Sequence, residues 1–268
     1  MFLKVITILF FVALSAGQGF SASVNHLGFD RLTLIAFGDS ITQGLARDYD
    51  GEGGYITWGI LKPPFGGRVY QEWGYEWYLE SIIESELPMP STIYNWGHMG
   101  FTTVDALSCT DQPNNCLDTV LMSSSAEQAQ LLLLMFGAND VYPHHGISIV
   151  AFIFNLRQII EKTRSYGIEP VLATITPNTN KDRWFDKEII NNWNVRIRQL
   201  AVEEDVVLAD HYSVMETDWK EFTSGDGLHL SALGNEKMAR TWYDAILNSK
   251  TLNPKTMNPG VFDLLLRP

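Results

Sequence analysis

Basic residues, cysteine and long apolar runs are all scarce in this sequence, and each shortage argues against a class of protein. The 19 lysines and arginines are outnumbered by 31 aspartates and glutamates, so the formal net charge is −12. An acidic surface leaves no basic patch to neutralise phosphates, which argues against nucleic acid or an anionic membrane as the main partner. The 2 cysteines have no paired histidine or further cysteine, too few ligands for structural zinc. We therefore expect neither a metal nor a cofactor.

The first 22 residues have the pattern of a secretory signal peptide. Lys4 gives a positive start, the apolar run Val5–Ala13 follows, and small residues continue to Ala22. The run is shorter than the ~20 apolar residues that span a bilayer, which favours cleavage over a membrane anchor. We expect a secreted or periplasmic protein with no stable membrane span, cleaved at a point between Ser15 and Ser23.

The two cysteines, Cys109 and Cys116, lie in one turn-rich stretch. In an exported protein this spacing predicts a local disulfide, and two free thiols are the alternative. The sequence has no internal repeat, low-complexity tract or interdomain linker. We therefore expect one domain over residues 28–250, followed by a tail at 251–268.

Short apolar runs alternate with amphipathic segments along the chain. The runs are mostly continuous, which is typical of strands buried on both faces. The predicted strands are Leu32–Phe37, Thr92–Trp96, Leu131–Phe136, Pro170–Ile175 and Val206–Asp210. The segments with apolar residues three and four apart, which predict helices, are Trp73–Glu86, Ile147–Tyr166, Asp186–Glu204 and Ser231–Asn248. This alternation indicates an α/β fold, in which a parallel sheet is covered on both faces.

A serine follows the first predicted strand, in Phe37-Gly38-Asp39-Ser40. Gly38 permits a sharp turn, so the Ser40 hydroxyl would lie at the carboxyl end of the strand, where ligands gather in parallel sheets. A helix N-terminus close by would offer backbone N–H groups to a developing oxyanion. Taken alone, the Gly-Asp-Ser sequence is equally typical of an ordinary turn.

Two further motifs directly follow the second and third predicted strands. The stretch Asn95–Thr103 has glycines at positions 97 and 100, where the backbone can approach a ligand closely. The sequence Gly137-Ala138-Asn139-Asp140 presents the Asn139 amide as a hydrogen-bond donor. Each motif alone is also consistent with the backbone geometry of a loop.

Asp226 and His229 precede the last predicted helix. A hydroxyl nucleophile is weak near neutral pH and needs a base, which His229 can supply. Asp226 lies three residues earlier, so its carboxylate can fold back onto the imidazole and fix its tautomer. Ser231 is expected only to cap the following helix. On its own, His229 would be a surface loop histidine.

In this order, the four motifs resemble the sequence blocks of the SGNH hydrolase family, the GDSL-type esterases and lipases, from about Leu32 to Ala239. The resemblance implies a flavodoxin-like three-layer α/β/α sandwich with a five-stranded parallel sheet. Ile41-Thr42 departs from the Leu after the serine that gives the family its name, without consequence for the chemistry. No Gly-x-Ser-x-Gly elbow is present, which disfavours the larger α/β-hydrolase fold.

The resemblance also implies a role for each motif residue. Ser40 would be the nucleophile, His229 the base and then the acid, and Asp226 the residue that orients His229. The oxyanion donors would be the backbone N–H groups of Ser40 and Gly100 and the side chain of Asn139. Position 97 is the alternative to Gly100, which is preferred because it precedes the threonine pair as in the family's pattern.

Other side chains have weaker claims to function. The acidic stretch at 48–53 resembles a calcium loop, but its twelfth position is Gly59, so we expect a mobile acidic loop. His144 and His145 have no histidine partner at metal spacing and are expected in a solvated loop. An aromatic-rich stretch follows the serine motif, and its loop members could stack on sugars or bind acyl chains. The expected substrate contacts are Asp39, Tyr55, Trp58 and Phe65.

The sequence thus predicts a secreted serine esterase that hydrolyses carboxylic esters through an acyl-enzyme on Ser40. The expected partner is a small-molecule, glycan or lipid ester: an acetylated carbohydrate, or a short acyl or lysophospholipid ester. One alternative is a non-catalytic glycan-binding protein on the same scaffold. Another is a cytosolic thioesterase whose N-terminus only resembles a signal peptide.

Overall fold

A computed structural model describes most of the chain between residues 29 and 253. The described residues are 29–44, 46–49, 55–58, 67–68, 74–87, 89–109, 116–179 and 187–253. In the three short segments at 46–49, 55–58 and 67–68, only the backbone is described. The expected signal peptide at 1–22, Phe65 and the tail from residue 254 onward lie outside the described residues.

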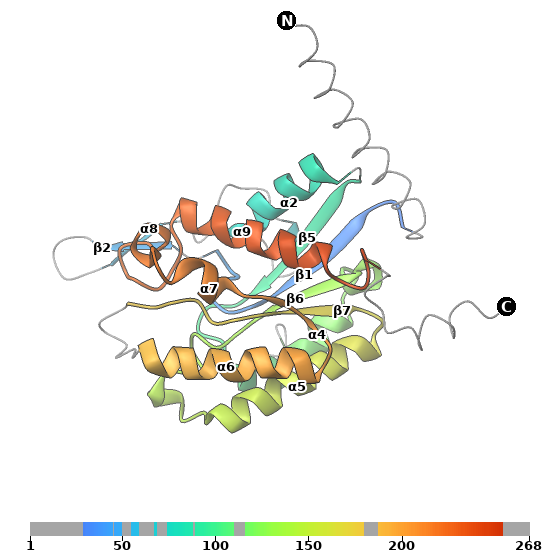
Figure 1. Cartoon of the computed structure of the whole chain (residues 1–268). Coiled ribbons are helices and arrows are strands. Elements are labelled where there is room, and N and C mark those ends of the chain that lie inside the picture. Colours follow the sequence, from blue (N-terminus) through green and yellow to red (C-terminus); the bar gives the residue numbers. More distant parts are fainter. Residues whose placement is uncertain are drawn as a thin grey trace, which may run out of the picture.

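The centre of the fold is a sheet with strand order β4-β5-β1-β6-β7-β8 (Figure 1). The strands are β1 Leu32–Gly38, β4 Gly67–Arg68, β5 Ser91–Gly97, β6 Leu131–Met135, β7 Glu169–Ala173 and β8 Val207–Ala209. From β5 to β8 every pairing is parallel, so the predicted five-stranded parallel sheet is confirmed. The two-residue strand β4 was not predicted, and it adds an antiparallel edge beside β5.

The strands form where the sequence has continuous apolar runs. All residues of β1 and of the Leu-rich strand β6 are buried. Since successive side chains of a strand point to opposite faces, each run contributes to two cores. Ile35 and Phe37 enter one cluster, whereas Leu34 and Ala36 enter the other. A continuous run is therefore what a sheet covered on both faces requires.

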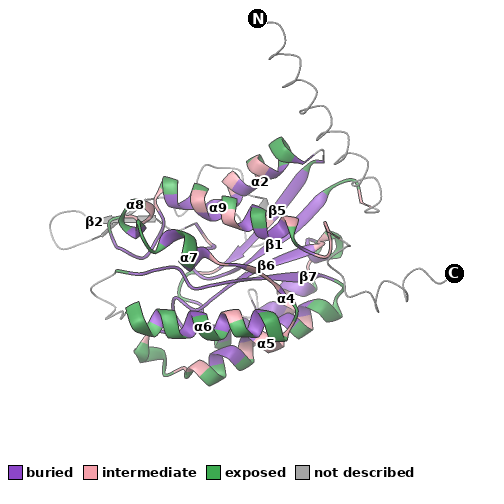
Figure 2. Ribbon diagram, viewed as in Figure 1, coloured by how far each residue is buried: buried purple, intermediate pink, exposed green. Residues whose placement is uncertain are grey.

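Helices cover both faces of the sheet, with their buried stripes turned inward (Figures 1 and 2). One core contains side chains of α3 Thr103–Leu107, α4 Leu117–Leu121, α5 Ile149–Ser165 and α6 Lys187–Glu203. The other contains side chains of α2 Tyr75–Glu86, α8 Trp219–Phe222 and α9 Ala232–Leu247. The remaining elements are η1 Ala126–Gln128, η2 Pro143–His145 and α7 His211–Met215. This is the expected α/β/α sandwich.

The helix boundaries agree with the prediction to within about two residues, as is usual for helix ends. Helix α2 begins at Tyr75 rather than Trp73, after Gly74 at φ 97°. The Ser231 side chain accepts a hydrogen bond from Gly234 N–H, so the predicted cap of α9 is confirmed. Among the described residues, no helix combines the length and the apolar character needed to cross a membrane. Cys109 and Cys116 form a disulfide.

The segment after the serine motif differs from the prediction. Strands β2 Ala46–Tyr49 and β3 Tyr55–Trp58 pair as an antiparallel hairpin. The expected acidic loop therefore begins in a strand at Asp48, and Tyr55 and Trp58 lie in a strand rather than a loop. The β-branched and aromatic residues of β3 favour extended structure, which explains the difference. His144 and His145 are exposed as expected, within the 3-10 turn η2.

Candidate active site

The sheet brings the first three motifs to one edge. Gly38, at the end of β1, is in register with Gly97 of β5 and with Met135 of β6. Because β5 and β6 flank β1, the turns that follow all three strands lie beside one another. Carboxyl ends of adjacent parallel strands are where such folds place their ligands. The serine motif thus lies between the two motifs that were expected to supply oxyanion donors.

The fourth motif reaches the same edge from a loop that precedes α9. His229 Nε2 lies 2.8 Å from Ser40 Oγ, across 189 positions of sequence. His229 Nδ1 lies 2.5 Å from Asp226 Oδ2. Since the Asp226 carboxylate can only accept, Nδ1 carries the hydrogen and Nε2 accepts from the Ser40 hydroxyl. All three side chains are buried. This is the arrangement that activates a serine hydroxyl.

A tight turn fixes the Asp226 carboxylate. Its Oδ1 accepts hydrogen bonds from the backbone N–H groups of Leu228 and His229, each 2.9 Å long, and from Ser224 Oγ at 3.1 Å. Burial alone would raise the pKa of Asp226, but the hydrogen bonds and charge of His229, with the two backbone N–H groups, lower that pKa to about 2. Asp226 is therefore a carboxylate at neutral pH.

Backbone N–H groups around Ser40 are available to a ligand. Within the described part of the chain, neither Ser40 N–H nor Gly100 N–H donates a hydrogen bond to another group. Gly100 is exposed and has φ 84°, a conformation that L side chains rarely adopt. Asn139 Nδ2 donates to the carbonyl of Phe101 at 2.9 Å, which holds the amide against the turn that contains Gly100. At position 97, the alternative, the Gly97 N–H already donates to Asn95 Oδ1 at 2.8 Å.

Direct contacts join the serine turn to the turn after β5. Gln43 Oε1 accepts a hydrogen bond from Met99 N–H at 2.8 Å. A Cβ at Gly97 would collide with the backbone of Thr42 and Gln43, so only glycine lets the two turns approach so closely. The sequence motifs name Gly97 but give Gln43 no role. Its position three residues after Ser40 was the only available signal.

Asp140 is buried beneath the Asn139 motif. Its Oδ1 accepts from Thr103 Oγ1 at 2.5 Å and from Thr103 N–H at 2.9 Å. Burial raises the pKa of Asp140 to about 6, against the opposing effect of the Thr103 hydrogen bonds. The pair ties the start of α3 to the loop after β6 and thereby fixes two motifs relative to each other.

Of the four residues expected to contact substrate, the structure describes the side chain of Asp39 alone. Asp39 is buried, and its carboxylate accepts a hydrogen bond from Ile41 N–H at 2.9 Å within the serine turn. Tyr55 and Trp58 lie in β3, of which only the backbone is described, and Phe65 lies outside the described residues. Contact of these four residues with substrate therefore stays a prediction.

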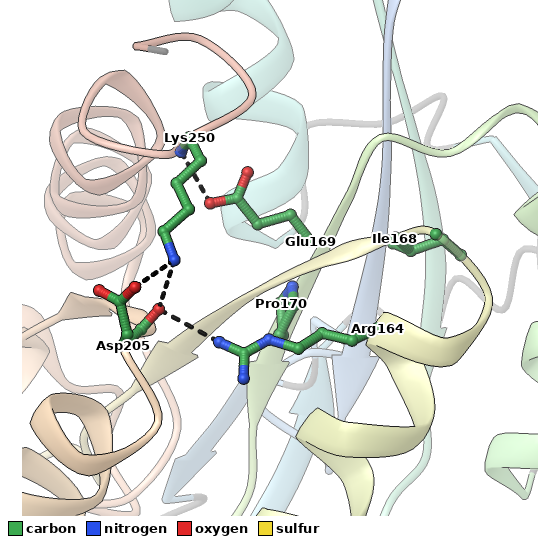
Figure 3. A pocket seen from close by; sticks show the side chains of 7 residues that line it. Arg164, Ile168, Glu169, Pro170, Asp205 and Lys250 are labelled. Atoms are coloured by element: carbon green, nitrogen blue, oxygen red, sulfur yellow. Dashed lines mark hydrogen bonds and ion pairs between the residues drawn. The ribbon is translucent and has the colours of Figure 1, made fainter. Parts of the chain in front are cut away.

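An open pocket of about 240 Å³ lies at the opposite, amino end of β7 and β8 (Figure 3). Its wall carries two cations and two carboxylates. Arg164 Nη2 donates to the carbonyl of Asp205, and Lys250 Nζ pairs with the Asp205 carboxylate. Glu169 accepts from the backbone N–H groups of Lys250 and Thr251. Among the residues that the structure describes, no group of three or more His, Cys, Asp or Glu side chains could hold a metal ion.

Comparisons with known proteins agree with this geometry. The sequence profile of the GDSL-like lipase/acylhydrolase family matches residues 36–237. An isoamyl acetate-hydrolyzing esterase 1 homolog of Rattus norvegicus is 26% identical over 238 residues, which cover 81% of each chain. A lipase/acylhydrolase from Enterococcus faecalis superposes with a TM-score of 0.62 at 20% identity, covering 81% of this chain and 96% of its own. An acetylxylan esterase from Geobacillus stearothermophilus gives a TM-score of 0.58 at 17% identity, with 80% and 94% covered.

Proposed function

The chain belongs to the GDSL-like lipase/acylhydrolase family, and from that premise we propose that it hydrolyses carboxylic esters through an acyl-enzyme on Ser40. The observation that carries the proposal is the continuous contact from Ser40 Oγ through His229 to Asp226. A hydroxyl, a base and an orienting carboxylate are the groups that acyl transfer needs. Two unengaged backbone N–H groups beside them suit an oxyanion.

In the proposed reaction, Ser40 Oγ attacks the ester carbonyl carbon while His229 Nε2 takes the hydroxyl proton. The oxyanion that forms accepts from Ser40 N–H, Gly100 N–H and the Asn139 amide. His229 then gives its proton to the alkoxide, and the alcohol leaves. Water attacks the acyl-enzyme with His229 again as base, which frees the acid and restores Ser40. Asp226, ionised at neutral pH, stabilises the imidazolium in both halves.

The decisive experiment is hydrolysis of p-nitrophenyl acetate by the wild type and by Ser40→Ala. We expect the variant to lose about 10⁴- to 10⁶-fold in kcat, as removal of a serine nucleophile does in other enzymes of this chemistry. Ser231→Ala is the control, because Ser231 is a half-buried serine close to the fourth motif that caps α9. A folded wild type that is inactive on acetyl through medium-chain esters would instead support a binding protein on this scaffold.

We further propose that the acyl group is short. The rat relative, 26% identical over most of both chains, is named for hydrolysis of isoamyl acetate, an acetate ester of a small alcohol. A series of p-nitrophenyl esters of rising chain length, run beside acetylated xylan and lysophospholipid, tests this. We expect kcat/KM to be highest at acetyl or propionyl. A maximum at medium chain length, or preference for lysophospholipid, would contradict the proposal.

Export remains our proposal for residues 1–22, with the hydrolase domain at 28–250 and a tail after it. The disulfide between Cys109 and Cys116 supports it, since disulfides persist mainly outside the cytosol. N-terminal sequencing of the protein from its natural source, with a count of free thiols, provides the test. We expect a start between Ser15 and Ser23 and no free thiol. A chain that begins at Met1 with both cysteines reduced would favour a cytosolic enzyme.

A further inference from the structure

A buried carboxyl group lies directly behind the serine turn, and the reaction described above gives it no part. Glu76 is the second residue of α2 and has no exposed surface. It shares the buried face of the helix with Leu79 and Ile83, three and seven positions later. A glutamate rarely occupies such a position unless its polar atoms are bound. Its contacts therefore indicate what it does.

Glu76 binds the side chain that joins the two active-site turns. Asn95 Nδ2 donates to Glu76 Oε1 at 2.9 Å and to the carbonyl of Thr42 at 2.6 Å. Asn95 Oδ1 accepts from Gly97 N–H at 2.8 Å. One amide thus connects the serine turn, the turn that leads to Gly100, and helix α2. Without Glu76, one of the two Asn95 N–H bonds would have no acceptor and the amide could rotate.

The glycine at position 74 leaves space for the Glu76 carboxyl group. A Cβ at Gly74 would lie 2.7 Å from Glu76 Oε2 and 3.4 Å from Gly44 Cα, and Gly74 has φ 97°. Gly44 ends the serine turn, so that turn and the Glu76 carboxyl group both lie beside Gly74 at the start of α2.

Among the residues that the structure describes, no cation is recorded in contact with Glu76. Its recorded partners are Asn95 from β5 and the adjacent Tyr75, which itself contacts Trp242 of α9. On α9, Arg240 pairs with Glu86 at the far end of α2. Burial raises the pKa of Glu76 well above its ordinary value, against weaker stabilisation by its own backbone N–H and by Tyr75. Burial therefore favours the protonated form of this carboxyl group.

We propose that Glu76 is a positioning residue for the reaction at Ser40, and that its carboxyl group holds Asn95 so that the serine turn and the Gly100 turn keep their relative placement. The inference rests on the proposed function, because it assigns these two turns to the nucleophile and to the oxyanion donors. It adds two residues, Glu76 and Asn95, that act without touching substrate.

Removal of either partner should slow the chemical step and leave substrate binding almost unchanged. For Glu76→Ala and Asn95→Ala we expect kcat per active site to fall about 10- to 100-fold with KM nearly constant, since a small misplacement of reacting groups can cost about 100-fold. Active sites are counted by titration with a fluorophosphonate, so that loss of folded protein does not count as loss of kcat. Glu84→Ala is the matched control, an exposed glutamate on the same helix.

Glu76→Gln tests whether Glu76 supplies a hydrogen-bond acceptor to Asn95 rather than a charge. The amide has the shape of a carboxyl group, accepts from Asn95 and has no charge, so we expect it to restore kcat to within about threefold of the wild type. A Glu76→Gln variant as slow as Glu76→Ala would overturn the proposal. If Glu76→Ala does not fold, Glu76→Asp replaces it, since the shorter acid cannot reach Asn95.

Failure of this inference is distinguishable from failure of the proposed function. An inactive wild type, or a Ser40→Ala variant as active as the wild type, would refute the esterase itself. An active wild type whose Glu76 and Asn95 variants keep kcat per titrated site, and lose only thermal stability, would leave the esterase intact. It would show that the pair merely supports the fold.

Discussion

The two ends of the sheet both carry charged side chains, but they hold them in opposite ways. At the carboxyl end, the side chains of Asp226 and His229 are 2% and 3% exposed. At the amino end, those of Asp205 and Lys250 are 75% and 30% exposed (Figure 3). The pocket at the amino end is therefore lined by solvated, mutually paired charges, while Ser40, His229 and Asp226 are packed under the turns of the sheet.

Burial is what gives the carboxyl end its chemistry. An exposed ion pair contributes about 0.2–1 kcal/mol, because water screens it and both side chains lose freedom when they pair. A buried pair interacts strongly, and removal of one partner is strongly destabilising, because the other is left buried without a partner or solvent. The same residue types thus have different consequences at the two ends, and matched substitutions can measure the difference.

The largest contrast is expected between two aspartates, one at each end. Asp226→Asn removes the charge that stabilises the His229 imidazolium and should lower kcat by about 10⁴-fold on p-nitrophenyl acetate. Asp205→Asn is the matched change, and asparagine tolerates the φ of 49° at that position. It should leave kcat unchanged. Equal losses of kcat in the two variants would show that the charge of Asp226 matters no more to the reaction than that of Asp205.

The second contrast concerns a buried carboxyl that has no cation. The folded-state pKa of Asp140 is about 6, above the ordinary value of about 3.9. Between these values the folded protein binds the proton more tightly, so its free energy of unfolding should fall as pH rises from about 4 to 6, by up to about 3 kcal/mol. Urea unfolding across this range measures it. In Asp140→Asn, the free energy of unfolding should fall by about 3 kcal/mol less than in the wild type over this pH range. In Asp205→Asn it should fall as much as in the wild type. Profiles that run parallel in all three proteins would contradict the prediction.

The third test asks whether stability and activity can be separated. The disulfide Cys109–Cys116 follows α3, away from the Ser40–His229–Asp226 contacts. Its short loop predicts a loss of about 2–3 kcal/mol when both cysteines become serine, on the chain-entropy model. We expect kcat per titrated active site to remain that of the wild type, because no motif residue is touched. A loss of kcat without a loss of stability would place this loop in the active site.

The smallest effect is expected at the amino-end pocket. Lys250→Ala removes the ion pair with Asp205, and exposed pairs of this kind contribute about 0.2–1 kcal/mol. The urea midpoint should shift slightly, less so at high salt, and kcat should not change. A loss above about 2 kcal/mol would mean that this end of the sheet is as firmly coupled as the other.

The sequence predicted the fold well because the relevant signals are local. Buried parallel strands require continuous apolar runs, and Leu131–Met135 and Leu32–Gly38 have them. The motifs stood out because turns after such strands tolerate few residue types. The strands β2, β3 and β4 gave a weaker signal, since each has only four or two residues and such short stretches occur in many loops as well.

The supporting residues could not be predicted in the same way. Glu76 interrupts an apolar stripe on α2, which signals a buried acid, but the sequence does not reveal that Asn95 is its partner. Gln43 follows the serine motif and Asp140 ends the Asn139 motif, but their contacts with Met99 and Thr103 form only once the sheet is assembled. Such pairings depend on the register between strands, which no short stretch of sequence contains.

The distance along the chain between Ser40 and His229 affects how the protein folds during its synthesis. The two side chains that must touch are separated by 189 positions, and α9, which packs against α2, is made only after His229. A chain still on the ribosome can therefore complete β1, β5 and β6 before the contact between Ser40 and His229 can form. On the proposed reaction, hydrolytic activity would appear only with the last step of assembly, and a truncated product that ends before His229 would lack it.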